Sequence, residues 1–177
     1  QTEKEVILDL WNGQHVGEDD YGRLTLLITG SGNHAEENYG SNVFRLTFYS
    51  GSTGFNEAVV SSTTVTTSSL ENWAHYALTL ASEGSSLTSN FFVNGDLDRK
   101  RTGLASASVG TIPGLVNGYI GAMQHRTKAQ SGVKRYSGKL SGSLDDFRYW
   151  KVKRTEDEIY NNWYRHVGGG TNTDDAN

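Results

Sequence analysis

The chain has 177 residues, of which 35% are hydrophobic and 20% charged, a composition that suits one globular domain with a sizeable core and excludes a disordered chain. Its 16 Lys and Arg against 20 Asp and Glu give a formal net charge of −4, which argues against a nucleic-acid partner because phosphate binding needs a basic surface. The chain has no cysteine, which excludes disulfides and thiolate chemistry, and no run of about 20 apolar residues that would indicate a membrane partner.

Short runs of alternating apolar and other residues fill the first third of the chain, a pattern typical of antiparallel strands. They lie at residues 6–11, 24–29 and 44–49, and Asn12–Gly13 after the first run predicts a turn. In each run we expect one face to pack inward and the other to lie nearer water. The apolar residues that share one face within each run are Val6, Leu8 and Leu10; Leu24, Leu26 and Ile28; and Phe44, Leu46 and Phe48.

Two further strands and a hairpin are predicted in the middle of the chain. Residues 73–80 alternate again, and their apolar face carries Tyr76, Leu78 and Leu80. The apolar run 91–93 leads into Asn94–Gly95. Because both residues of this pair tolerate positive φ, the pair predicts a tight hairpin.

The last part of the chain predicts two strands and one helix. Residues 119–121 and 144–152 have strand composition, and the polar stretch 124–132 between them predicts a loop. Residues 155–158 match a capping box, in which a Thr hydroxyl and a Glu carboxylate each bind a free backbone amide. In the predicted helix, Ile159 and Trp163 are spaced i, i+4 and are expected to pack on the sandwich. Gly168 is placed to end the helix.

Motifs in the second half of the chain match those of one known superfamily. They are Asn72–Thr79 (NWAHYALT), Phe91–Gly95 (FFVNG), Tyr119–Gly121 (YIG), Gly142–Trp150 (GSLDDFRYW) and Thr155–Ile159 (TEDEI). In order and spacing they resemble the laminin-G-like branch of the concanavalin A-like lectin and glucanase superfamily. Members of that branch carry W-x-H-x-A-x-T, V-N-G, Y-I-G and D-[DE]-[FV]-R-x-[YW] motifs before a short helix. The resemblance implies an all-β jelly-roll sandwich of two antiparallel sheets, one of them concave, with one short C-terminal helix.

The domain is expected to span residues 1–167, followed by a polar, Gly-rich linker or tail at 168–177. Residues 161–177 resemble the connectors that follow laminin-G-like domains in very long structural proteins of tailed phages of marine bacteria. Similar repeats occur in secreted bacterial adhesins. The resemblance implies a module of a larger polypeptide, located outside the cell or on a virion surface, with neighbouring domains of the same chain as partners.

Acidic residues do not follow a hydrolase pattern, and we expect no catalytic residue. Glycoside hydrolysis needs two carboxylates about 5 to 10 Å apart. Related glucanases place them as E-x-D-x-x-E on one strand, and this motif is absent from the sequence. Glu5 and Asp9 fall on one face of a predicted strand, about 13 Å apart at about 3.3 Å per residue, which is too far for a retaining pair. The five histidines show neither metal nor triad spacing.

Asp145 is the candidate metal ligand. It shares a face with Phe147 and Tyr149 in the predicted closing strand, and an aspartate at the edge of a core needs a partner. In calcium-binding relatives the aspartate at this place in the motif binds a structural Ca²⁺, so the resemblance implies Ca²⁺ at Asp145, completed by backbone carbonyls and water. The alternative is that Asp145 accepts hydrogen bonds from backbone amides or from an arginine.

Aromatic and charged side chains on the predicted outward faces are the candidates for ligand binding. They are Trp11, Arg45, Tyr49 and His75, with Asp9 beside them. Aromatic platforms and planar hydrogen-bonding groups suit a polysaccharide or a cell-surface glycan. The alternative is that these side chains form half-buried cross-strand pairs. We therefore expect a carbohydrate-binding or adhesion module, with a structural spacer or assembly domain as the alternative and a glycoside hydrolase as a more distant one.

Overall fold

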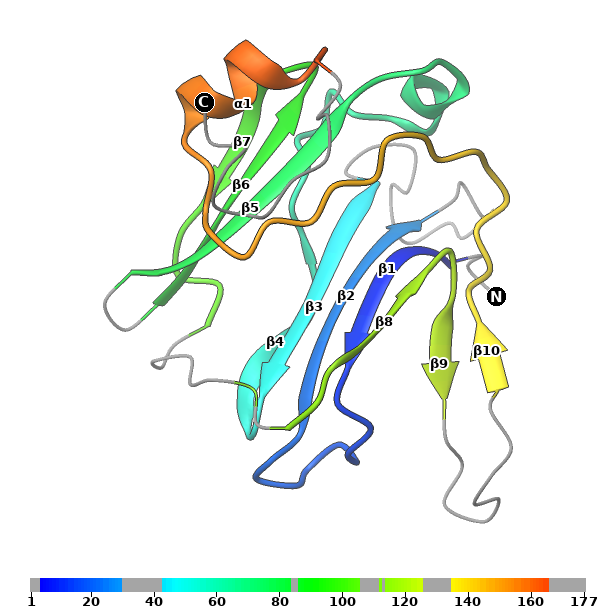
Figure 1. Ribbon diagram of the computed structural model, residues 1–177, viewed down its shortest axis with the longest axis vertical. Helices are drawn as coiled ribbons and strands as arrows, with labels where there is room; N and C mark the ends of the chain where they lie inside the picture. Colours follow the sequence, from blue (N-terminus) through cyan, green and yellow to red (C-terminus); the bar gives the residue numbers. More distant parts are fainter. Residues whose placement is uncertain are drawn as a thin grey trace.

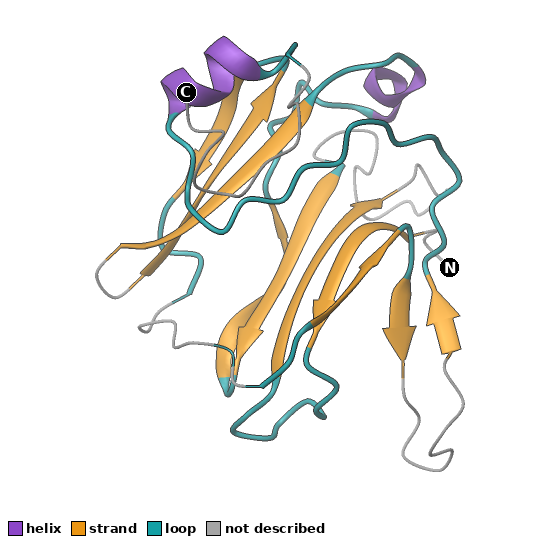
Figure 2. Ribbon diagram, in the orientation of Figure 1, coloured by secondary structure: helices purple, strands orange, loops and turns teal. Residues whose placement is uncertain are grey.

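A computed structural model describes residues 4–29, 43–83, 86–105, 112, 114–125 and 135–165 of the chain. Within these ranges the chain forms strands and two short helical segments. Figures 1 and 2 show two main sheets and a separate two-stranded hairpin, with α1 (Glu156–Asn162) against the smaller main sheet. The sheets have five, three and two strands, and every pairing is antiparallel. The expected all-β sandwich with a single short C-terminal helix is confirmed. No helix in these ranges has the length and apolar character needed to cross a membrane.

The larger sheet has the strand order β4-β3-β2-β1-β8. Its strands are β1 (Lys4–Trp11), β2 (Gly22–Thr29), β3 (Phe44–Ser50), β4 (Thr53–Val59) and β8 (Asn117–Ile120). The smaller sheet has the order β5-β6-β7, and the remaining two strands form a hairpin. These strands are β5 (Tyr76–Glu83), β6 (Ser86–Val93), β7 (Asp96–Arg101), β9 (Met123–His125) and β10 (Arg135–Ser137). The short 3₁₀ helix η1 (Thr67–Glu71) precedes β5.

The core lies between the two large sheets, and aromatic rings from both fill it. Phe44 of β3 lies 4.7 Å from Phe91 of β6 and 4.8 Å from Tyr76 of β5, measured between ring centroids. Phe44, Phe91 and Leu46 are each at most 2% exposed. Because each fully buried Phe or Leu contributes about 1.5 to 3 kcal/mol, this cluster holds the two sheets together. The alternation predicted for β3 and β5 is confirmed.

The hairpin between β6 and β7 forms as its dipeptide predicts. Asn94 and Gly95 have φ values of 51° and 88°, the left-handed conformation of a tight two-residue turn. Gly95 is needed for a second reason, because a Cβ there would lie 2.3 Å from Cδ1 of Trp163. The tip of the hairpin therefore carries the residue that follows α1.

The helix begins as its capping box predicts. Thr155 Oγ1 accepts a 3.2 Å hydrogen bond from the Glu158 amide, and the Thr155 amide donates a 2.7 Å bond to the Glu158 carboxylate. Ile159 is buried as expected. The helix ends at Asn162, so Gly168 does not end it as predicted; that residue lies outside the described ranges. The proposed linker at 168–177 lies outside them too.

Strand β1 departs from simple alternation. A bulge lies between Val6 and Leu8, so that Val6 pairs with Leu27 whereas Leu8 pairs with Leu26. Neighbouring residues of a strand point to opposite faces. The prediction that Val6 shares a face with Leu8 and Leu10 is therefore wrong.

The closing strand predicted at 144–152 does not form, and these residues have no strand pairing. The segment crosses from β10 to α1 as an extended strap (Figure 1). Asp146 has a φ of 52°, which interrupts an extended conformation. The Arg148 side chain pairs with Asp146 and donates to the carbonyl of Asn162, so it ties the strap to the helix. The side chains that the missing pairing leaves exposed are Leu144, Phe147, Tyr149 and Val152.

Candidate functional site

Three of the predicted ligand residues come together on one face of the larger sheet. The register places Trp11 beside Arg23, and Arg23 beside Tyr49, across β1, β2 and β3. Arg45, Thr47 and Tyr49 are each two residues apart in β3, so their side chains point to the same side of the sheet. We call this side, which faces away from the core, the outer face; its residues are Asp9, Trp11, Arg23, Thr25, Arg45, Thr47 and Tyr49.

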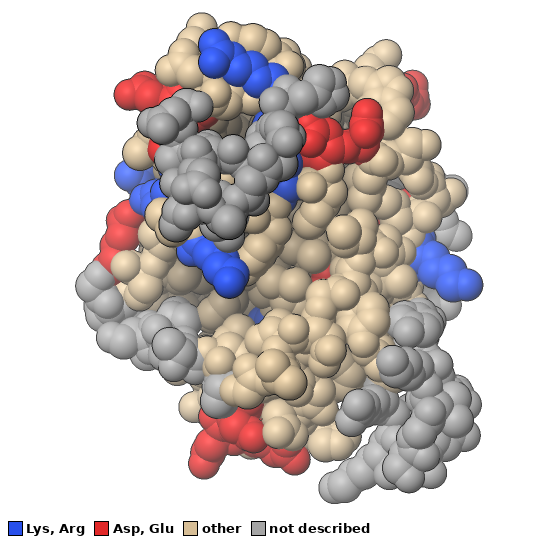
Figure 3. Space-filling view, viewed as in Figure 1, with Lys and Arg blue, Asp and Glu red and all other residues tan. Residues whose placement is uncertain are grey.

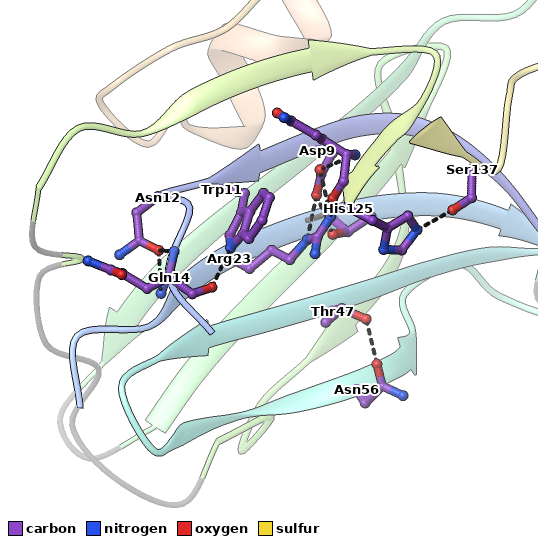
Figure 4. A network of polar contacts seen from close by, with 12 residues as sticks. Asp9, Trp11, Asn12, Gln14, Arg23, Thr47, Asn56, His125 and Ser137 are labelled. Atoms are coloured by element: carbon purple, nitrogen blue, oxygen red, sulfur yellow. Dashed lines mark hydrogen bonds and ion pairs between the residues drawn. The ribbon is translucent and has the colours of Figure 1, made fainter. Parts of the chain in front are cut away.

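Asp9 is the centre of a buried polar cluster on the outer face (Figure 4). Its carboxylate is 0% exposed and accepts two 2.8 Å hydrogen bonds from Arg23, through Nε and Nη2. The Thr25 hydroxyl donates a third bond at 2.8 Å, and the backbone N–H of Gln124 donates a fourth at 3.2 Å. A buried carboxylate with four donors is well compensated for its loss of water.

Trp11 does not project to solvent. It is 5% exposed, its Nε1 donates a 2.9 Å bond to the Gln14 carbonyl, and the Arg23 guanidinium lies 5.0 Å from its ring centroid. Arg23 also donates to the Gln124 carbonyl at 2.8 Å, so β9 covers this end of the face. The expected exposure of Trp11 and Asp9 is therefore wrong. Trp11 packs against Arg23 and bonds to Gln14, and Asp9 is enclosed by donors that include the backbone of Gln124 in β9.

Arg23 and Gln124 were not predicted as site residues, although the sequence carries one signal for Arg23. Arg23 and Thr25 alternate with Leu24 and Leu26 in β2, and a polar residue in a buried strand needs a partner. Gln124 and His125 fall within β9, so the predicted loop at 124–132 is wrong for its first two residues; residues 126–132 lie outside the described ranges. His125 Nε2 is hydrogen-bonded to the Ser137 hydroxyl at 2.5 Å, and burial lowers the pKa of His125.

The accessible part of the outer face lies over β3 and β4. Tyr49 and Arg45 are half-buried there, and the Tyr49 ring packs 5.7 Å from the ring of Tyr21. Tyr21 is 3% exposed, and burial raises its pKa. At the β4 bulge, Thr47 Oγ1 donates a 3.0 Å bond to the side chain of the exposed Asn56 (Figure 4). An aromatic ring, a guanidinium and an amide thus lie beside a rigid buried cluster.

His75 lies apart from the outer face. It precedes β5 in the smaller sheet, and its ring centroid is 6.1 Å from that of Trp163. Its backbone is fixed to the hairpin through Asn94, whose side chain accepts a 2.9 Å bond from the His75 amide. Burial lowers the pKa of His75, and the nearby charge of Arg148 lowers it further. The structure therefore separates His75 from Trp11, whereas the ligand-binding role of either residue stays a prediction.

Asp145 is exposed on the strap rather than at the edge of the core. Its Oδ1 accepts a 2.9 Å bond from the Asp146 amide, and the Asp146 carboxylate pairs with Arg148. The described residues contain no group of three side chains able to hold a metal ion. Because Ca²⁺ takes six to eight oxygen ligands, a site at Asp145 would depend on backbone carbonyls and water for most of them. Calcium binding stays a prediction from the motif, which melting with and without chelator would test.

Comparison with known families covers most of the chain. A family model described as the concanavalin A-like lectin/glucanases superfamily, Laminin_G_3, matches residues 14–160. The chain belongs to this family. No curated protein and no solved structure matches it. Membership in the family agrees with the sandwich described above and supports a lectin-like or structural module.

Within this laminin-G-like domain, the centre of the outer face is a buried carboxylate. All four hydrogen bonds to the Asp9 carboxylate come from N–H or O–H donors of Arg23, Thr25 and Gln124. A general acid or a nucleophile has to contact its substrate. Asp9 is completely buried, and its hydrogen bonds fix the Arg23 guanidinium against the ring of Trp11.

Proposed function

We propose that this domain is a non-catalytic carbohydrate-binding module of a larger extracellular or virion-surface polypeptide. The observation that supports it is the grouping of Tyr49, Arg45 and Asn56 around a rigid polar cluster on the outer face. The ring of Tyr49 offers an apolar face to a sugar ring, and the two planar polar groups suit its hydroxyls. We expect weak binding of an extended polysaccharide, because the three side chains present a shallow surface.

The fixed positions of the Tyr49 and Asn56 side chains support the same proposal. Affinity is lost when side chains must be ordered on binding. Tyr49 packs against the buried Tyr21, and Thr47 holds Asn56, so part of this ordering is complete before the ligand arrives.

One observation favours the second candidate, a structural spacer or assembly domain. Four apolar side chains are exposed on or beside the strap, between 43% and 67% of their surface. They are Leu144, Phe147, Tyr149 and Val152. Exposed apolar surface of this kind is suited to contact with a neighbouring domain or a second copy.

The two candidates differ in what each substitution does. Affinity electrophoresis on neutral β-glucans and on acidic polysaccharides should retard the domain, and Tyr49→Ala and Arg45→Gln should each weaken the retardation. Tyr160→Ala, an exposed tyrosine on α1, is the matched control and should have no effect. Release of reducing sugar would contradict the non-catalytic proposal. Absence of retardation, together with self-association that Phe147→Ser and Tyr149→Ser abolish, would favour the assembly role.

A further inference from the structure

A groove with two arginines lies between the edge strand β7 of the smaller sheet and the end of β4. Its volume is about 510 Å³, and the described residues that line it are Val59, Ser62, Thr63, Arg99 and Arg101. Val59 ends β4 and Ser62 and Thr63 follow it, whereas both arginines belong to β7, so the groove lies where the two sheets meet. None of these lining residues is acidic.

Both arginines are held in place by backbone carbonyls across the groove. Arg99 Nη1 donates a 2.7 Å bond to the carbonyl of Ser61, and Arg101 Nη1 donates a 2.7 Å bond to that of Val59. Asp98 strengthens the junction by accepting a 2.7 Å bond from the Ser62 amide. Since a guanidinium has five N–H donors in one rigid plane, a bond from one of them orients the others of Arg101.

The positive charges of Arg99 and Arg101 repel each other at the β7 edge. Burial lowers the pKa of Arg101, and the charge of Arg99 lowers it further. An anion placed between two guanidinium groups relieves their repulsion and accepts charge-assisted hydrogen bonds from both. Such a site is selective for oxyanions, because the donors of Arg match the paired oxygens of carboxylates and sulfates.

We propose that this groove binds the carboxylate or sulfate-ester group of an acidic saccharide. The inference rests on the proposed carbohydrate-binding function and adds to it a charged ligand class and a separate contact site. The net charge of −4 argues for a short acidic segment held locally rather than for a long polyanion such as nucleic acid. Figure 3 agrees, since acidic and basic side chains are dispersed over the face drawn there.

Calorimetric titration of the whole chain tests the proposal with three probes: an oligogalacturonide, a sulfated oligosaccharide and a neutral cello-oligosaccharide. Arg99→Gln and Arg101→Gln should each weaken binding of an acidic probe by about tenfold or more, the loss expected for a hydrogen bond to a charged group. Lys100→Gln is the matched control, because it removes the same charge from an exposed side chain between them. It should change the affinity by less than about twofold.

Further measurements separate folding from binding. Arg101→Lys keeps the charge and loses the planar donor pair, so it should weaken binding less than Arg101→Gln and melt like the wild type. On the wild type, inorganic sulfate should compete with the acidic probe. Equal losses in Lys100→Gln and Arg101→Gln, or acidic binding that survives loss of both arginines, would overturn the inference. Tighter binding of single-stranded DNA than of the acidic saccharides would overturn it as well.

The same titrations distinguish this inference from the proposed function of the outer face. Neutral binding that Tyr49→Ala weakens, with no binding of either acidic probe, would leave the outer-face proposal standing and reject the groove. Acidic binding that depends on the arginines, without any neutral binding, would support the groove and reject the outer face. If none of the probes binds, both proposals fail.

Discussion

Asp9 and Arg23 form a doubly hydrogen-bonded ion pair between β1 and β2, with both N···O distances at 2.8 Å. Asp9 is 0% exposed, and 11% of the Arg23 side chain is exposed. Removing one member of a buried pair leaves the other charge without compensation. Asp9→Leu should therefore lower the free energy of unfolding by about 3 to 5 kcal/mol, measured by urea denaturation.

A double substitution separates the pair from its surroundings. Arg23→Met combined with Asp9→Leu should recover much of the lost stability, because replacing a whole buried pair by apolar residues is often close to neutral. Asp20→Asn, in the exposed loop after β1, is the control and should stay within about 0.5 kcal/mol of wild type. Additive losses in the double variant would mean that the two side chains do not act as a pair.

Two glycines with positive φ allow steric and conformational effects to be distinguished. Gly95 and Gly103 have φ values of 88° and 70°, but only Gly95 has a close neighbour, Trp163. Gly103→Ala should cost about 1 kcal/mol for its backbone alone. Gly95→Ala should cost about 2 to 4 kcal/mol, because overpacking adds to the backbone term. Thermal melting followed by tryptophan fluorescence would measure both, and equal effects would show that Trp163 does not pack on the hairpin.

The N-cap of α1 should contribute measurably to stability. Thr155→Ala removes the hydroxyl that accepts from the Glu158 amide and should lower the free energy of unfolding by about 1 kcal/mol. Thr155→Ser keeps the acceptor and serves as the control. A melting midpoint that is the same in all three proteins would mean that Thr155 does not cap the helix.

Stability should fall on mild acidification. Folding lowers the pKa of His75 and of His125, so the unfolded chain binds protons more readily. The free energy of unfolding is then highest above the unfolded value of about 6.5 and is lost as the pH falls below it. Denaturation of wild type between about pH 7.5 and 5.5 should show this decline, and His75→Gln should reduce it. His15→Gln, in the exposed loop after β1, is the control; an unaltered decline in His75→Gln would contradict the assignment.

The sequence by itself determined the features that depend on neighbours along the chain. Alternation placed Phe44 and Tyr76 in the core, Asn94–Gly95 formed the predicted hairpin, and the capping box at Thr155 began the helix. The motifs were also sufficient to predict the family. In each case the deciding interaction is local or follows from the two-residue period of a strand. The co-facial placement of Tyr49 and Arg45 on β3 was predictable for the same reason.

Only the tertiary structure decided which faces are covered. Asp9 is buried because Arg23 pairs with its carboxylate and Gln124, 115 residues further along the chain, donates to it. Trp11 is buried against the guanidinium of the same Arg23. The strap at 144–152 has the composition of a strand, but Arg148 ties it to the helix, so its apolar residues stay exposed. Strand periodicity specifies to which side a residue points, whereas its exposure depends on whichever distant segment packs against that side.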